Sequence, residues 1–350
     1  MTTVHEGASA PSTVLNLSAG PDTGGQMIRT KHAFDRYSDW SMRCVVNSVS
    51  YMEYGTDLRW DDRLVEKLWA AADVVHVHRQ ISHYLGFDEP KPMVLHHHGT
   101  LFRQQSARQL AKAAEIGAVN VVSTIDLLRY GPDLTWLPSP HDLDWLASLR
   151  KPNRTKTVRI VHAPTNREVK STDLIIRVVK RLAERYPIEF TLVEDRPWLE
   201  CLAAKARADI LIDQLNLGYG NNALEAWGMG IPVVAGAEPD TRDRMLDMLG
   251  SLPFYEADEV DLYPRLEALV ADKALRTQYG RLGRTYVRQW HSGETVVRLL
   301  ESLYERAIVE RKPSRSAVAR PVQNRLQPYE VEPGVFRHMT PAMAGMKGLA

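Results

Sequence analysis

A glycine-rich loop that leads into a helix is the strongest chemical signal in this sequence. Gly218 and Gly220 flank Tyr219, and Asn221 and Asn222 are residue types that cap the start of a helix. The free N–H groups and the positive dipole end of such a helix attract an anion, for example a diphosphate. The segment therefore predicts an anion-binding site where this loop meets its helix.

Glu225 lies inside the same predicted helix, about one turn from its start. A carboxylate in that position repels phosphate and is better suited to accept hydrogen bonds from sugar hydroxyls. The neighbouring residues Leu224, Ala226 and Trp227 indicate a largely buried helix, where an unpaired glutamate would be costly. The alternative is an ordinary surface glutamate with no part in binding.

The stretch 208–236 resembles the donor-binding signature of the retaining nucleotide-sugar glycosyltransferases of family 4 type. These enzymes have two Rossmann-like domains, an arrangement called the GT-B fold. The resemblance covers residues 13–310 and has its strongest motifs in the second half of the chain. It implies that Glu225 binds the ribose hydroxyls of the nucleotide. The matching residues are Gly218, Tyr219, Gly220, Glu225, Ala226, Gly230, Pro232, Val233 and Val234.

The sequence departs from the family pattern at Leu217, where the family has a first glutamate that contacts the transferred sugar. Asp213 and Gln214 precede the glycine loop and resemble the Asp-Gln-Leu of a subgroup. These two residues are therefore the candidates for the missing contact with the sugar.

A basic loop follows the first predicted strand of the second half and contains Arg167 and Lys170. The resemblance implies that this pair holds the donor diphosphate and neutralises the leaving nucleotide. Bond cleavage builds charge on the leaving phosphate, and fixed cations stabilise that charge in the transition state. The alternative is a solvated basic loop.

Two loops in the first half also follow predicted strands. Gly24 and Gly25 come after the first strand, and the resemblance implies that their loop approaches the sugar or the diphosphate. The alternative is a tight turn. His98 follows a later strand, at a place where the resemblance implies a histidine near the donor sugar.

Histidines gather on two predicted strands of the first half. His76 and His78 lie on one face of their strand, whereas His96 and His97 point to opposite faces of theirs. A metal site and a set of buried, hydrogen-bonded histidines are the alternatives to a sugar contact. The spacing matches no recognised zinc site, and no cysteine is close in sequence. We therefore expect no metal ion and no cofactor.

Strands and helices alternate along the chain, which predicts an α/β fold with parallel sheets. Ligands bind such sheets beyond the carboxyl ends of the strands, so the loops described above would face a central cleft between two Rossmann-like domains. The predicted segments are a flexible N-terminus (1–12), an N-terminal acceptor domain (13–145), a linker (146–157), a C-terminal donor domain (158–291), a crossover helix (292–310) and a tail (311–350).

Composition agrees with a globular protein of two domains. The 350 residues include 44 Lys and Arg against 43 Asp and Glu, which gives no strong field for nucleic acid or a membrane. Two cysteines far apart do not form a disulfide framework. We see neither a membrane span nor a signal peptide, and therefore expect a cytoplasmic protein with at most peripheral membrane contact.

The resemblance implies a retaining hexosyltransferase that moves a hexose from a nucleotide-diphosphate sugar to an acceptor hydroxyl without a metal. The donor is then a substrate, and the acceptor can be a glycan, a lipid, a protein or a small molecule. Two alternatives stay open, namely a sugar-nucleotide epimerase of the same fold and a catalytically degenerate donor-binding protein.

Overall fold

The computed structural model describes residues 12–78 and 90–310. The predicted tail (311–350) lies outside this part of the chain, as does the predicted flexible N-terminus except for Ser12.

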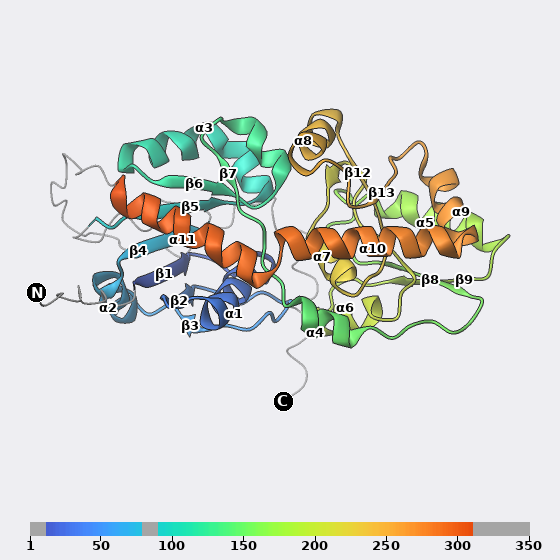
Figure 1. Ribbon diagram of the computed structural model, residues 1–350, viewed down its shortest axis with the longest axis horizontal. Helices are drawn as coiled ribbons and strands as arrows, with labels where there is room; N and C mark the ends of the chain where they lie inside the picture. Colours follow the sequence, from blue (N-terminus) through green and yellow to red (C-terminus); the bar gives the residue numbers. More distant parts are fainter. Residues whose placement is uncertain (1–11, 79–89, 311–350) are drawn as a thin grey trace, which may run out of the picture.

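The first half of the described chain forms a parallel sheet with helices on its faces (Figure 1). Within the described residues the sheet has seven strands in the order β3-β2-β1-β4-β5-β6-β7. Its elements are β1 (Thr13–Ser18), the 3-10 helix η1 (Thr23–Gly25), α1 (Gln26–Tyr37), β2 (Ser41–Val46), β3 (Leu58–Arg59), α2 (Asp62–Ala71), β4 (Val74–His78), β5 (Met93–His97), α3 (Gly99–Ile116), β6 (Val119–Val122), the 3-10 helix η2 (Ile125–Tyr130), β7 (Thr135–Trp136) and α4 (Leu143–Leu149).

The second half repeats this plan around another sheet. The order β11-β12-β10-β8-β9 is parallel except for the β11–β12 pair, and β13 adds to β12. The elements are β8 (Val158–His162), α5 (Thr172–Ala183), β9 (Ile188–Leu192), α6 (Trp198–Lys205), β10 (Ile210–Ile212), β11 (Leu217–Gly218), α7 (Asn221–Gly228), β12 (Val233–Ala237), α8 (Pro239–Leu249), β13 (Tyr255–Glu256), α9 (Leu262–Ala271), α10 (Lys273–Trp290) and α11 (Gly293–Val309).

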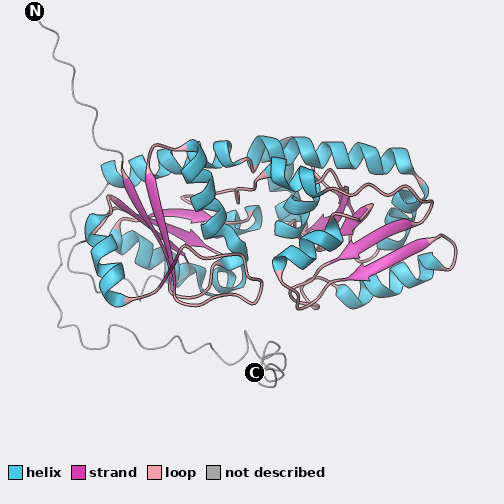
Figure 2. Cartoon of the chain, turned by 90° about the horizontal axis from the view of Figure 1, so that it is seen from below, coloured by secondary structure: helices cyan, strands magenta, loops and turns pink. Residues whose placement is uncertain are grey.

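The predicted α/β architecture with two Rossmann-like halves is confirmed. Every residue of β4 and β5 is buried, as expected for parallel strands that are covered on both faces. Figure 2 shows the two sheets side by side with helices around each. The carboxyl ends of both sets of parallel strands carry the loops that were predicted to bind a ligand.

The last two long helices run end to end along the molecule (Figure 1). α10 packs against α7 in the second half, whereas α11 returns to the first half and packs against α1. Val296, Leu300 and Tyr304 of α11 share an apolar core with Val14 and Phe34. The last described helix of the chain therefore covers one face of the first sheet.

The structure differs from the sequence analysis at two segments. The stretch 146–157, predicted as a linker, begins inside α4, because the Asp142 carboxylate caps this helix at the Trp145 N–H (3.0 Å) and Leu146 is buried. The hydrophobic pattern also gives no clear signal for α8, six of whose eleven residues are charged or polar. Within residues 12–78 and 90–310, no helix combines the length and apolar character needed to cross a membrane.

Gly283 lets α10 lie close to α7, since a Cβ on this residue would come within 2.0 Å of Trp227 Cδ1. We expect Gly283→Ala to lower the free energy of unfolding by about 1–3 kcal/mol, because fully buried Trp227 has no space to move into. Urea denaturation measures this change. Gln278→Ala, at an exposed position of the same helix, is the control and should change stability by less than about 0.5 kcal/mol. An equally stable Gly283→Ala protein would contradict this packing.

Candidate functional site

The predicted anion-binding loop lies at the carboxyl edge of the second sheet. β10 ends at Ile212, and Asp213 follows it directly. The Gly220 N–H, at the start of α7, donates to Asp213 Oδ2 at 2.7 Å, and Lys170 Nζ donates to Asp213 Oδ1 at 2.5 Å. Gly218 has a φ of +80°, a conformation that suits glycine. The start of α7 thus has a buried cation beside it, and Asp213 neutralises both positive features.

Arg167 contacts carboxylates other than Asp213. Its guanidinium is exposed and donates to Glu194 at 2.8 Å and to Asp173 at 2.5 Å. Among the described contacts, none joins Arg167 to Lys170 or to Asp213. Arg167 and Lys170 therefore have different carboxylate partners, and their joint role at a diphosphate stays a prediction.

The glycine loop of the first half meets the start of α7. Asn221 Nδ2 donates to the Gly24 carbonyl at 3.2 Å, and a Cβ on Gly24 would lie 2.5 Å from the same nitrogen. Gly24 and Gly25 have φ values of +63° and +70°, so glycine is needed at both positions. Asn222 Nδ2 donates to the Ala163 carbonyl at 2.6 Å, next to β8. Loops from both sheets therefore come together at this helix end.

Glu225 is buried in a network of donors. Lys205 Nζ donates to its Oε2, and Trp198 Nε1 donates to its Oε1 at 2.7 Å. Arg29 Nη2 of α1 lies 3.7 Å from Oε1. Glu225 and Lys205 are 2% and 1% exposed, so this ion pair is held away from solvent. Ribose hydroxyls would have to share or replace these donors, and the ribose role of Glu225 stays a prediction.

The sequence analysis named none of Lys205, Arg29 and Trp198 as site residues. Trp198 and Tyr54 both face the Arg29 guanidinium, whose carbon lies 5.5 Å and 5.3 Å from the two ring centres. A signal for Lys205 existed, because a lysine surrounded by Cys201, Leu202, Ala206 and Ala208 is unusual for an exposed helix. Such a lysine needs a buried partner.

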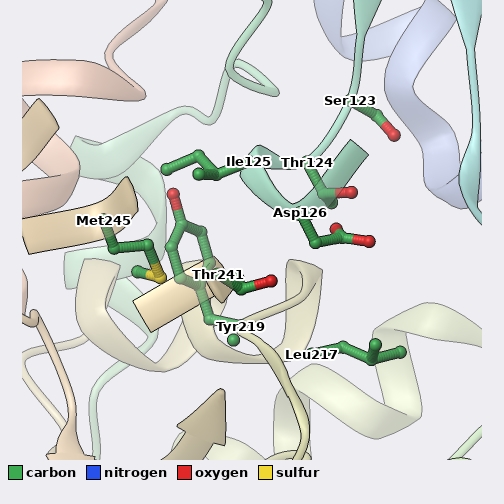
Figure 3. Close-up of a pocket in the computed structure, with 9 residues that line it drawn as sticks. Ser123, Thr124, Ile125, Asp126, Leu217, Tyr219, Thr241 and Met245 are labelled. Carbon is green, nitrogen blue, oxygen red and sulfur yellow. The ribbon is translucent and has the colours of Figure 1, made fainter. Parts of the chain in front are cut away.

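A small cavity lies between the two halves beside Leu217 (Figure 3). Its volume is about 20 Å³, which is enough for a water molecule and far too small for a sugar. Arg129 bridges the halves nearby, with donor bonds to Glu238 at 3.1 Å and to Thr241 at 2.7 Å. The two halves are therefore in contact here, and a sugar can occupy this cavity only when they part. The lining residues are Ser123, Thr124, Ile125, Asp126, Leu217, Gly218, Tyr219, Thr241 and Met245.

The two candidates for the contact missing at Leu217 do not line this cavity. Both oxygens of the Asp213 carboxylate are engaged by Lys170 and Gly220. Gln214 is buried, and its backbone carbonyl accepts from the Gly236 N–H at 2.9 Å. The Tyr219 hydroxyl also faces other groups, since it contacts the Tyr286 hydroxyl and lies 3.2 Å from His291 Nε2.

One buried stack at the carboxyl edge of the first sheet contains His76, His78, His96 and His98, whereas His97 faces Gln109 and Asn120. His76 Nδ1 lies 2.7 Å from the Tyr304 hydroxyl, and His76 Nε2 lies 3.2 Å from His96 Nδ1. His98 Nε2 lies 2.8 Å from His78 Nδ1. Burial lowers the pKa of His76 to about 3, so this ring is neutral at physiological pH.

These histidines have the donor type that a metal such as zinc prefers. One nitrogen from each of His76, His78 and His96 lies within 4.8 Å of the others. The rings are stacked, however, with centres 4.7 Å apart for His76 and His78 and 5.3 Å apart for His76 and His96. Both nitrogens of His76 already have hydrogen-bond partners, so the stack fits a hydrogen-bonded cluster better than a metal centre.

Comparison with solved structures identifies the architecture. HepE of Anabaena, in complex with UDP and glucose, superposes over 84% of this chain and all (100%) of its own, with a TM-score of 0.59 and 12% identity. A putative UDP-N-acetylglucosamine 2-epimerase from Listeria monocytogenes covers 87% of this chain and 98% of its own (TM-score 0.56, 13% identity). The chain has the GT-B fold.

A sucrose-phosphate synthase from Thermosynechococcus elongatus shares this GT-B fold, at 13% identity over 85% of this chain and 99% of its own, with a TM-score of 0.56. No protein-family model matches the chain, and no curated protein matches it in sequence. Within this fold the α7 start is joined to Lys170 through Asp213 and to the Gly24 loop through Asn221.

Proposed function

We propose that this protein is a retaining glycosyltransferase that moves a hexose from a nucleotide-diphosphate sugar to an acceptor hydroxyl, without a metal ion. The observation that supports this most is the meeting of three features at the α7 start. These are the Gly220 N–H, the buried Lys170 ammonium and the Gly24 loop from the other half. Asp213 accepts only one of the three N–H donors of Lys170, so this ammonium can still contact a diphosphate held at the α7 start between the two sheets.

In the proposed reaction the bond between the sugar C1 and the diphosphate oxygen breaks, and a bond between C1 and the acceptor oxygen forms on the same face of the sugar. The leaving phosphate accepts the proton of the acceptor hydroxyl, so a dedicated base is not required. Lys170 and the α7 dipole stabilise the negative charge on the leaving diphosphate. The acceptor, whether a glycan, a lipid, a protein or a small molecule, would bind mainly to the first half.

A thermal-shift panel of UDP, GDP, ADP and TDP, with and without their hexose conjugates, tests the proposal. We expect one nucleotide to raise Tm by about 5 °C at a hundred times its Kd, and EDTA to leave this shift unchanged. NMR of the glycosylated product should show the anomeric configuration of the donor. If no nucleotide stabilises the protein, or if EDTA removes the shift, metal-independent transfer is wrong.

The ribose role of Glu225 has its own test. We expect the wild-type protein to bind the nucleotide found in the panel about tenfold more tightly than its 2′-deoxy form, because a hydroxyl-to-carboxylate hydrogen bond is lost. Glu225→Gln should bind the two forms equally in calorimetry. Glu301→Gln, on α11, where the carboxylate accepts from the Ser38 hydroxyl, is the matched control. If Glu225→Gln still binds the nucleotide about tenfold more tightly than its 2′-deoxy form, Glu225 does not bind the ribose.

Two other functions make different predictions about turnover. An epimerase would change the donor sugar without any acceptor. This alternative is included because the putative epimerase from Listeria monocytogenes has the same fold. A degenerate binding protein would bind the donor without converting it, which the occupied Glu225 and the apolar Leu217 favour. Incubating the donor with and without acceptors separates the three.

A further inference from the structure

Two residues that line the cavity beside Leu217 each have a buried side-chain oxygen that lacks a hydrogen-bond partner among residues 12–78 and 90–310. These oxygens are Oδ1 of Asp126 and Oγ1 of Thr124. Asp126 is 2% exposed. Figure 3 shows both residues on one side of the cavity, with Leu217 and Tyr219 on the other side. A buried carboxylate oxygen without a donor is costly, so this position calls for a ligand.

The Asp126 carboxylate is held in a fixed orientation. Arg103 donates to its Oδ2 through Nη2 at 2.6 Å and through Nε at 3.0 Å. Arg129 Nε donates to the Asp126 carbonyl at 3.1 Å and fixes the backbone of η2. Because Arg103 occupies Oδ2, the carboxylate presents Oδ1 as its open acceptor.

Asp126 and Thr124, which form one wall of the cavity, favour a ligand that carries neutral hydrogen-bond donors. A carboxylate only accepts hydrogen bonds and repels an anion, whereas the Thr124 hydroxyl can donate or accept. A cation at Oδ1 would lie close to the Arg103 guanidinium and be repelled by it. A group of hydroxyls, as in a sugar, fits both oxygens.

The position of the cavity connects it to the proposed donor site. Leu217 and Gly218 line the cavity, and the same loop continues within two residues to Gly220 at the start of α7. A sugar attached to a diphosphate at α7 therefore lies next to this wall once the halves part and close around it. The side chain of Leu217 offers that sugar no polar atom.

We propose that Asp126, together with Thr124, binds a hydroxyl of the donor sugar from the first half of the chain. Asp126 thereby supplies the carboxylate that Leu217 cannot. This inference rests on the proposed function, because it requires a nucleotide sugar at the α7 start.

The test compares two probes, the nucleoside diphosphate and its hexose conjugate that stabilise the wild-type protein most in the panel. In Asp126→Ala we expect the conjugate to bind at least tenfold more weakly, while the Kd of the free diphosphate changes less than twofold. Asp126→Asn keeps one acceptor oxygen and should lie between. Asp133→Asn, an exposed carboxylate in the same segment, is the control and should bind both probes like the wild type.

A second substitution guards against a general loss of structure. Leu217→Glu in the wild-type background places two carboxylates in one cavity and should weaken binding of the conjugate, because like charges repel. In the Asp126→Ala background the same substitution should restore it. If the role of Asp126 is purely structural, Asp126→Ala should weaken the binding of both probes equally. Leu217→Glu should then weaken binding of the conjugate in the wild-type background and fail to restore it in the Asp126→Ala background.

The outcomes separate the two proposals. If no nucleotide in the panel binds the wild-type protein, the proposed function fails and this inference fails with it. If the wild-type protein binds both probes and Asp126→Ala keeps full affinity for the conjugate, the role of Asp126 alone is overturned.

Discussion

Replacing Lys170 by alanine is expected to slow sugar transfer by about 10²- to 10³-fold, the usual cost of removing one preorganised donor from a developing negative charge. Lys170 is nearly buried and lies against Asp213 beside the Gly220 N–H, so its ammonium is fixed before the donor arrives. Release of the nucleoside diphosphate in the presence of acceptor measures the rate. The expected loss is in kcat, because the charge on the leaving phosphate develops only in the transition state.

Arg167→Ala is the matched control for Lys170→Ala. Arg167 comes from the same loop, but its guanidinium is exposed and is used by Glu194 and Asp173. We expect its removal to change the rate by less than about threefold, since an exposed pair contributes little. A wild-type rate for a folded Lys170→Ala protein would exclude Lys170 from the site. A large loss for Arg167→Ala would instead support the pairing that the sequence analysis proposed.

Replacing Lys205 by alanine is expected to lower the free energy of unfolding by about 3–5 kcal/mol, the cost of leaving a buried charge without its partner. Glu225 would keep the Trp198 N–H and the more distant Arg29, but it would lose the ammonium that contacts its Oε2. Urea denaturation measures the loss.

A double variant shows whether that loss comes from the buried pair. Adding Glu225→Gln to a Lys205→Met protein removes both charges and should recover at least half of the stability. Lys180→Ala, at an exposed position of α5, should stay within about 0.5 kcal/mol of the wild type. If Lys205→Ala is equally harmless, Glu225 is not the buried, paired carboxylate that the structure describes.

Sequence reasoning succeeded where the signal is local. The loop at Gly220, the pair Gly24–Gly25 and the order of strands and helices depend on backbone conformation within a few residues, which glycines and hydrophobic patterns report directly. These features also located the start of α7 and the nearby Lys170.

The partners of the charged side chains could not be predicted in this way. Arg29 and Glu225 come from different halves, and Asp126 faces Leu217 across the boundary between the two sheets. A local pattern does not specify which distant loop will face a given position. The sequence analysis therefore looked for a substitute for the missing glutamate in the neighbouring residues Asp213 and Gln214, whereas Asp126, the residue that we propose, comes from the opposite half.

The return of α11 to the first sheet also sets the order in which the protein can fold during synthesis. The strands β1–β7 leave the ribosome first, but the apolar face that includes Val14 and Phe34 stays uncovered until α11 has been made. The second half, whose sheet and helices are complete by the end of α10, can bury its own core earlier. The portion of the chain that is translated first is therefore the last to reach its native packing. Until then it exposes apolar side chains to which other nascent chains can bind.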